Sequence, residues 1–159
     1  MKASCALDHE VTDQLLADLR KDPFAGLGWQ FDGVEFPLRF APGEYLRATR
    51  TSDGVCLGVA LIVRSLPGCC EVHSFLGELA RPHMKEICKM VVRHAFSVPS
   101  TERVTAYCPS DIPAAARRAA SIGFKHEGTI RNMAKRNGKL LDFHVYGILR
   151  KEFEEWQQQ

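Results

Sequence analysis

Apolar residues recur every three to four positions in two segments of the chain, which is the spacing of an amphipathic helix. The first helix is expected over residues 12–21, where Thr12 is a capping residue and Pro23 ends the pattern. The second helix is expected over residues 84–96. The apolar positions are Leu15, Leu16 and Leu19 in the first helix and Met84, Ile87, Val91 and Ala95 in the second. Each helix therefore has one face suited to packing against a sheet.

Between these two helices the pattern changes to that of β-strands. Three runs begin at Glu44, and the turn signals Ser52-Asp53-Gly54 and Leu66-Pro67-Gly68 separate them. Short turns of this kind join neighbouring antiparallel strands, so the three runs predict a β-meander. The third run covers residues 69–75, and its side chains alternate between two faces. One face carries Cys70, Val72 and Ser74, and the other carries Glu71, His73 and Phe75.

A third helix is expected after a short β-prone run at residues 104–108. Ser110 or Asp111 is the expected N-terminal cap, because the side-chain oxygens of these residue types accept hydrogen bonds from the first free N–H groups. Pro113 is suited to the first turn of the helix, and Gly123 is suited to its end.

The C-terminal part of the chain predicts a closing hairpin. Its two strands are expected over residues 124–131 and 139–149, around Asn137-Gly138, a dipeptide favoured in type I′ turns. The acidic and glutamine-rich end over residues 152–159 predicts a frayed tail.

The order helix, meander, helix, strand, helix and hairpin decides the fold class. The strand-helix-strand connection between Cys69 and Cys108 requires one parallel strand pair in an otherwise antiparallel sheet, with a right-handed crossover. The predicted fold class is therefore α+β, or mixed α/β, with helices on both faces of a central, mostly antiparallel sheet. We expect one domain over residues 1–159, made of an N-terminal helix and loop region at 1–43, a core at 44–153 and a tail at 154–159.

Length, composition and charge narrow the classes of protein. A chain of 159 residues with 45% hydrophobic and 25% charged residues fits one folded domain and not a long disordered segment. The net charge of +2 and the lack of a long basic run do not favour a nucleic-acid partner. Since the N-terminus lacks the apolar stretch of a signal peptide and no apolar run reaches the roughly 18 residues of a membrane span, we expect a cytoplasmic protein without a membrane partner.

The six cysteines do not predict a metal site from their spacing. Neither Cys-x-x-Cys nor His-x-x-x-His occurs, and adjacent Cys69 and Cys70 would point to opposite faces of a strand. We therefore expect reduced thiols and no metal cofactor.

Two segments of the C-terminal half carry a resemblance to a known family. Residues 112–131 contain an alanine-rich helix that ends in Gly123-Phe124, followed by Glu127-Gly128 and Arg131. This segment resembles the GNAT superfamily of N-acetyltransferases. Residues 142–153 are similar to the closing strand of the branch that acetylates ribosomal-protein N-termini. The resemblance extends over residues 44–153, about two-thirds of the chain.

The resemblance implies a mode of cofactor binding. In this family the central parallel strands splay apart, and their free backbone groups bind the pantetheine arm of acetyl-CoA. The pyrophosphate rests on N–H groups at the start of the next helix, where the helix dipole favours anions. The positions that correspond here are Ser74, Phe75 and Leu76 on the strand and Arg81, Pro82, His83, Met84, Lys85 and Glu86 in the phosphate loop.

Four positions depart from the family pattern. Met84 and Glu86 stand at two positions of the phosphate loop where the family has small residues. Glycine at such a position lets a phosphate approach the backbone closely, whereas the carboxylate of a glutamate would repel the phosphate. Ile112 and Ala119 replace the family's asparagine and its general-acid tyrosine, and neither side chain can donate a proton.

Candidate catalytic residues follow from what acetyl transfer requires. A base must take the proton of the attacking amine, and a donor must stabilise the carbonyl oxyanion. His73 is the first candidate for the base and Glu71 the second, because both side chains share one face of the key strand; the alternative is an ordinary structural pair. The resemblance places Arg131 and Asp142 beside the substrate, and the alternative for these two is a cross-strand ion pair.

Two functions fit these residues. The first is an acetyl-CoA-dependent N-acetyltransferase that transfers the acetyl group to a primary amine of a small molecule or protein, by direct attack in a ternary complex. The second is a non-catalytic protein of the same fold that binds a partner protein, for example in the assembly of a phage particle, with a virion location in that case. A homodimer is compatible with both.

Overall fold

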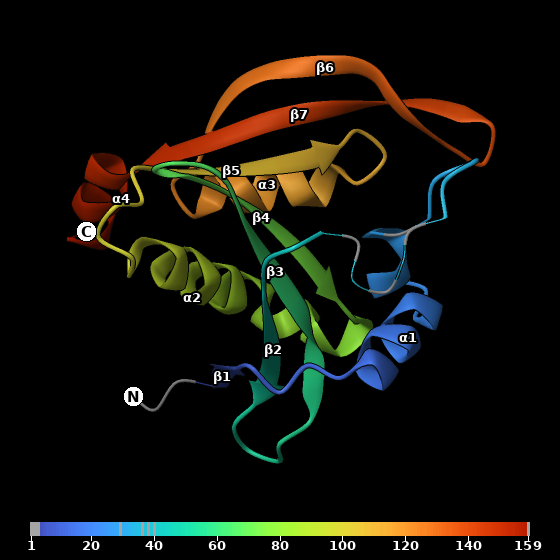
Figure 1. Cartoon of the computed structure of the whole chain (residues 1–159), viewed down its shortest axis with the longest axis horizontal. Coiled ribbons are helices and arrows are strands. Elements are labelled where there is room, and N and C mark those ends of the chain that lie inside the picture. The colour runs from blue at the N-terminus through green and yellow to red at the C-terminus, as the bar shows by residue number, and fades with distance from the viewer. Residues whose placement is uncertain (1–3, 29, 36, 38, 40, 159) are drawn as a thin grey trace.

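The computed structural model describes residues 4–28, 30–35, 37, 39 and 41–158, and its strands form one seven-stranded sheet in the order β1-β2-β3-β4-β5-β7-β6 (Figure 1). The strands are β1 (Cys5–Asp8), β2 (Glu44–Arg50), β3 (Cys56–Leu66), β4 (Cys69–Leu76), β5 (Arg103–Pro109), β6 (Lys125–Arg136) and β7 (Lys139–Leu149). The α-helices are α1 (Asp13–Lys21), α2 (Met84–Phe96), α3 (Pro113–Ser121) and α4 (Arg150–Gln157), and two 3-10 helices are η1 (Ala25–Gly28) and η2 (Glu78–His83). Strands β4 and β5 are parallel and the other neighbouring pairs are antiparallel, which confirms the predicted mixed fold.

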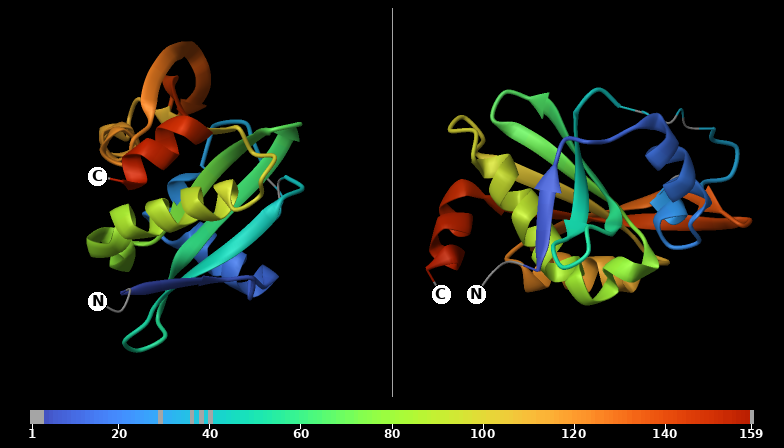
Figure 2. Two further views of the ribbon diagram at one scale, coloured as in Figure 1. Left: turned by 90° about the vertical axis from the view of Figure 1, so that its left-hand side faces the viewer. Right: turned by 90° about the horizontal axis from the view of Figure 1, so that it is seen from below.

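Helices cover both faces of the sheet (Figure 2). Helix α1 packs on one face, where its buried Leu16 and Leu19 lie in one cluster with Val59, Leu61 and Phe75. Helices α2, α3 and α4 contribute to the larger cluster on the other face. Because both faces are covered, the apolar residues of β3 form a continuous run instead of an alternating one. Within the described part of the chain, no helix has the length and apolar character needed to cross a membrane.

Several local predictions are confirmed. Helix α1 follows Thr12, whose side-chain oxygen accepts a hydrogen bond from the backbone N–H of Leu15 at 3.1 Å. Helix α2 has the predicted bounds. The turn between β6 and β7 has positive φ angles at Asn137 (50°) and Gly138 (77°), as a type I′ turn requires.

The predicted cap of the third helix is wrong. Helix α3 follows Ile112, which makes no side-chain capping hydrogen bond. The backbone N–H of Ser110 donates to the carbonyl oxygen of Asp142 at 2.9 Å, and the carboxylate of Asp111 pairs with Arg136 at 2.6 Å. The backbone of Ser110 and the side chain of Asp111 thus contact the distant β6–β7 hairpin, and neither residue is the N-terminal cap of α3.

The expected frayed tail is instead helix α4, which ends at Gln157, while Gln159 lies outside the described residues. The carboxylate of Glu152 accepts a hydrogen bond from the backbone N–H of Leu149 at 3.0 Å and so stabilises the first turn. Phe153 is buried and stacks on Phe96 with 4.7 Å between ring centroids. Tertiary packing of one aromatic face explains why a segment with a tail-like composition is helical.

Gly58 is a position where the fold requires glycine. Its φ is +143°, and a Cβ added there would lie 2.4 Å from the carbonyl oxygen of Phe75 on β4. We expect Gly58→Ala to lower the free energy of unfolding by about 2–4 kcal/mol, because backbone strain and a clash with a neighbouring strand act together. The matched control is Gly54→Ala, with φ +72° and open space around the added Cβ, which should cost only about 1 kcal/mol. Urea denaturation followed by circular dichroism compares them, and equal costs would show that the β3–β4 contact is unimportant.

Candidate active site

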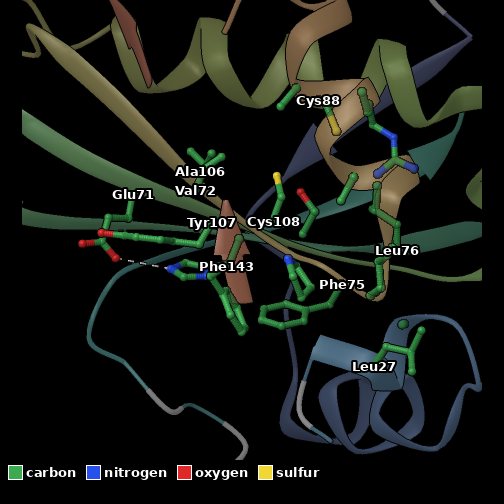
Figure 3. Close-up of a pocket in the computed structure, with 18 of the residues that line it drawn as sticks. Leu27, Glu71, Val72, Phe75, Leu76, Cys88, Ala106, Tyr107, Cys108 and Phe143 are labelled. Carbon is green, nitrogen blue, oxygen red and sulfur yellow. Dashed lines mark ion pairs between the residues drawn. The ribbon is translucent and has the colours of Figure 1, made fainter. Parts of the chain in front are cut away.

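The parallel pairing of β4 with β5 stops after three residue pairs, and a cleft opens beyond that point. The paired residues run from Cys69 with Arg103 to Glu71 with Thr105, although β4 continues to Leu76 and β5 to Pro109. Both strands line the cleft, which has a volume of about 870 Å³ (Figure 3). Along this part of the sheet, β4 stays paired with β3 and β5 with β7, so each strand turns one edge towards the cleft. Backbone N–H and C=O groups at such edges can bind an extended, amide-bearing ligand.

His73 and Glu71 both line the cleft and lie side by side on β4. His73 Nε2 is 3.6 Å from Glu71 Oε2, and the two side chains are 28% and 30% exposed. Burial lowers the pKa of His73, and the Glu71 carboxylate partly opposes that shift. The imidazole is therefore neutral at pH 7 and can accept a proton, while Glu71 can stabilise the imidazolium that results.

The structure brings Arg118 into the cleft, a residue that the sequence did not single out for the site. Arg118 of α3 lines the cleft beside the thiols of Cys88 and Cys108, and its charge partly opposes the burial that raises both thiol pKa values. The pKa of Cys108 is raised to about 11, so this thiol stays protonated and is no nucleophile. The signal for Arg118 was present in the sequence, because it lies three residues after Ala115 and four before Ile122, on the apolar face of α3.

Tyr107 of β5 also lines the cleft, close to Glu71 (Figure 3). Burial raises the pKa of its phenol, and the charge of Glu71 adds to the effect. The hydroxyl is therefore protonated at neutral pH and can donate a hydrogen bond.

The expected cofactor residues divide into two groups. Ser74, Phe75 and Leu76 of β4 line the cleft, as does Met84 at the start of α2. The remaining members of the expected phosphate loop do not lie among the cleft-lining residues; they are Arg81, Pro82, His83, Lys85 and Glu86. The first three residues of this loop end η2 and the last three begin α2, so helical turns take the place of an open loop.

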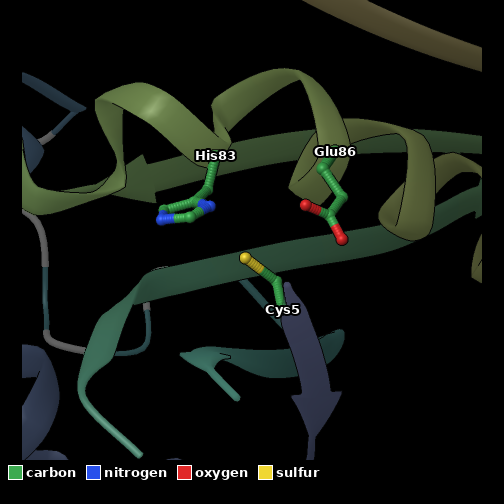
Figure 4. A group of neighbouring side chains, drawn as sticks. All are labelled: Cys5, His83 and Glu86. Atoms are coloured by element: carbon green, nitrogen blue, oxygen red, sulfur yellow. The ribbon is translucent and has the colours of Figure 1, made fainter. Parts of the chain in front are cut away.

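Three charged or polar side chains of this segment, those of Arg81, His83 and Glu86, make contacts with residues outside the segment. The guanidinium of Arg81 lies over the ring of Phe24, 4.3 Å from its centroid. The side chains of His83 and Glu86 face Cys5 on β1 (Figure 4). Glu86 Oε1 accepts a hydrogen bond from the backbone N–H of Ser4 at 2.9 Å. Arg81 therefore contacts Phe24, and Glu86 contacts the N-terminal segment of the chain.

The two expected substrate residues lie on the hairpin and are not among the residues that line the cleft. Arg131 of β6 is exposed. Asp142 of β7 accepts a hydrogen bond from the backbone N–H of Asn132 at 2.8 Å, next to the irregularity of β6 where Asn132 has a φ of +51°. The structure therefore gives Asp142 a local role in shaping the hairpin.

Ile112 and Ala119 both line the cleft. Their side chains are apolar and cannot donate a proton. Arg118 and Tyr107 are polar residues that also line the cleft.

Arg136 holds one wall of the cleft in place. Its side chain is only 6% exposed, and its Nη1 lies 2.6 Å from Asp111 Oδ2. It also donates to the carbonyl oxygens of Gln30 at 2.9 Å and Leu27 at 2.8 Å, and its guanidinium lies over the ring of Phe31. The Asp32 carboxylate also accepts hydrogen bonds from the backbone N–H groups of Asn137 and Gly138, so Leu27, Gln30 and Asp32 are all joined to the end of β6 and the β6–β7 turn.

Comparison with solved structures places this architecture among acetyltransferases. A GCN5-related N-acetyltransferase from Brucella melitensis is 17% identical, with a TM-score of 0.77 over 99% of this chain and 81% of that one. Spermidine N-acetyltransferase from Vibrio cholerae, solved with CoA and spermine, is 10% identical, with a TM-score of 0.77 over 95% and 98%. A GNAT-family acetyltransferase from Bacillus anthracis is 14% identical, with a TM-score of 0.61 over 67% and 66%. No family model and no curated protein matches the sequence. The chain has the GNAT fold, as the resemblance predicted.

Proposed function

We propose that this chain is an acetyl-CoA-dependent N-acetyltransferase that acts on a primary amine. The observation that carries the proposal is the cleft between the diverging strands β4 and β5, with a histidine and a carboxylate side by side on its wall. The pantetheine arm would bind along the edge of β4 that faces the cleft, at Ser74, Phe75 and Leu76. The mainly apolar cleft would exclude water from the thioester.

The reaction would proceed by direct attack of the amine on the thioester carbonyl carbon. The amine nitrogen forms a bond to that carbon and loses a proton to His73, directly or through one water. The C–S bond then breaks, and CoA leaves as a thiolate that takes up a proton. Glu71 would stabilise the imidazolium of His73, while Arg118 or the Tyr107 hydroxyl would donate to the carbonyl oxyanion or the leaving thiolate.

Binding of the cofactor is the first test of the proposal. We expect calorimetric titration of the full chain with acetyl-CoA to give a dissociation constant in the micromolar range, as is usual for enzyme ligands. Ala106→Trp should abolish the heat, because Ala106 lines the cleft and an indole would fill it. The matched control Leu140→Trp changes an exposed residue of the hairpin and should bind like the parent chain.

Turnover is the second part of the same test. The release of free CoA thiol is measured with a panel of amines, including polyamines, because a structural neighbour was solved with spermine, and peptides with free N-termini. Saturable thiol release that depends on one class of amine would support the proposal. Absence of binding heat at millimolar acetyl-CoA would contradict it.

A second candidate is a non-catalytic protein that uses the same fold to bind a partner. The apolar residues Ile112 and Ala119 at the family's polar positions favour it, as does the helical form of the expected phosphate loop. This function predicts neither acetyl-CoA binding nor thiol release. Binding without release with any amine would favour a protein that holds the cofactor but does not catalyse transfer.

A further inference from the structure

Three metal-binding side chains meet between β1 and the start of α2, outside the cleft. Donor atoms of Cys5, His83 and Glu86 all lie within 4.8 Å of one another. Figure 4 shows the thiol of Cys5 on β1 pointing towards the imidazole of His83 and the carboxylate of Glu86, which extend from the helical segment above it. Cys5 lies 78 positions before His83 and 81 before Glu86, so the spacing of the sequence could not reveal the cluster.

The backbone holds these donors in place. His83 and Glu86 are three residues apart at the junction of η2 and α2, and this spacing puts their side chains on the same face of the helix start. Cys5 is 2% exposed and lies in the β1–β2 ladder opposite Arg50. All three donors thus come from regular elements and need only side-chain rotation to approach one ion.

One polar atom already contacts all three side chains. Ser4 Oγ lies 3.1 Å from His83 Nδ1 and 3.8 Å from Cys5 Sγ, and it also donates a hydrogen bond to Glu86 Oε2. The donors therefore face a common point instead of pointing to separate regions of solvent. A hydroxyl at that point is also a suitable fourth oxygen for a four-coordinate ion.

We propose that Cys5, His83 and Glu86 bind one Zn²⁺ ion, with the Ser4 hydroxyl or a water as the fourth ligand. A thiolate, an imidazole nitrogen and a carboxylate oxygen are the three protein donors that Zn²⁺ uses, and magnesium or calcium would require oxygen donors only. Binding releases the thiol proton of Cys5, and no redox change takes place.

A second cluster, His9, Glu44 and His94, is the main competitor for added metal. Glu44 Oε1 is 2.6 Å from His94 Nε2 and 3.7 Å from His9 Nε2. The side chain of His9 is 66% exposed, and the short contact of His94 with Glu44 already satisfies both groups. This cluster lacks a thiol, so spectroscopy can tell the two sites apart.

Zinc at the proposed site would join the short edge strand β1 to the helix that borders the cleft. Met84, which lies between His83 and Glu86, lines the cleft. The ion would therefore hold the start of α2 in a defined position, independently of whether the cleft carries out acetyl transfer.

Cobalt substitution tests the proposal, because Co²⁺ occupies zinc sites and a Co²⁺–thiolate bond absorbs in the near ultraviolet. We expect the reduced full-length chain to bind one Co²⁺ with this absorption, and one equivalent of Zn²⁺ to displace it. Cys5→Ser should remove the absorption, whereas Cys56→Ser, which changes a partly buried thiol on β3, should keep it. Since Cys5 is buried, Glu86→Gln provides a variant that is easier to fold and should weaken binding 10- to 100-fold.

The melting temperature provides a second readout. Zn²⁺ should raise it for the parent chain in a concentration-dependent manner, and much less for Glu86→Gln. Cobalt binding without thiolate absorption, or absorption that persists in Cys5→Ser, would overturn the proposal. Metal binding that is lost only in His94→Ala would assign the ion to the competing cluster and would overturn it as well.

Discussion

Replacing His73 with alanine is expected to lower turnover 10²- to 10⁴-fold while leaving acetyl-CoA affinity within a few-fold of the parent chain. The reason is that a general base contributes rate enhancement of this size, whereas the proposed contacts with the cofactor are made by the backbone edge of β4. Steady-state kinetics with the best amine from the panel, together with calorimetric titration, measure the two effects separately. Turnover within twofold of the parent chain would show that His73 is not the base.

The pH profile adds a readout that a purely structural histidine would not affect. The base must be neutral, so kcat should fall as pH decreases through the pKa of His73, which burial lowers from the ordinary value of a histidine. Glu71→Gln removes a charge that raises this pKa, so the acidic limb should move to lower pH. His144→Ala is the matched control, because His144 lies on β7 beside Thr129 and is not among the cleft-lining residues.

Arg136→Leu is expected to lower the free energy of unfolding by about 3–5 kcal/mol, because the buried guanidinium donates three hydrogen bonds and each bond of a charged group contributes about 1.5 kcal/mol. The loss is large because Arg136 is 6% exposed and its replacement also leaves the carbonyl oxygens of Gln30 and Leu27 without their donor. Urea denaturation followed by circular dichroism measures it. Since Leu27 and Phe31 line the cleft, affinity for acetyl-CoA should fall too.

The neighbouring residue provides the control for this prediction. Lys135→Met removes the same charge from an exposed side chain and should change stability by no more than about 0.5 kcal/mol. Asp111→Asn should destabilise in the same direction as Arg136→Leu, and the double variant should cost less than the sum, because the two residues share one interaction. Equal losses of unfolding free energy for Arg136→Leu and Lys135→Met would show that the contacts of Arg136 with Asp111, Gln30 and Leu27 do not stabilise the protein.

Elements with a strong local signal could be predicted from the sequence. Helix α2 has one apolar stripe and formed with the expected bounds, and the Asn137-Gly138 turn adopted the expected backbone. Strand β1 was missed because four residues are too few to show a reliable alternation. The failures at Ser110, Asp111 and the C-terminal helix share one cause, which is that long-range contacts overrode a local preference.

The candidate site was predictable to the extent that it follows from one strand. Alternation along β4 placed His73 and Glu71 on one face, and the structure shows their side chains side by side. The same reasoning could not place His83 and Glu86, because the direction of a side chain at a helix start depends on the packing of that helix. These two residues face Cys5 of β1 (Figure 4).

The sequence by itself determined the order of most elements, the mixed sheet with one parallel pair, and the shared face of His73 and Glu71, because these depend on periodicity and on turn chemistry within short segments. Only the tertiary structure decided where β4 and β5 separate, that Arg118 and Tyr107 line the resulting cleft, and that Arg136 fastens its wall. It alone also brought Cys5 to His83 and Glu86. The physical reason is that such contacts join residues distant along the chain, and they form only when whole elements pack together.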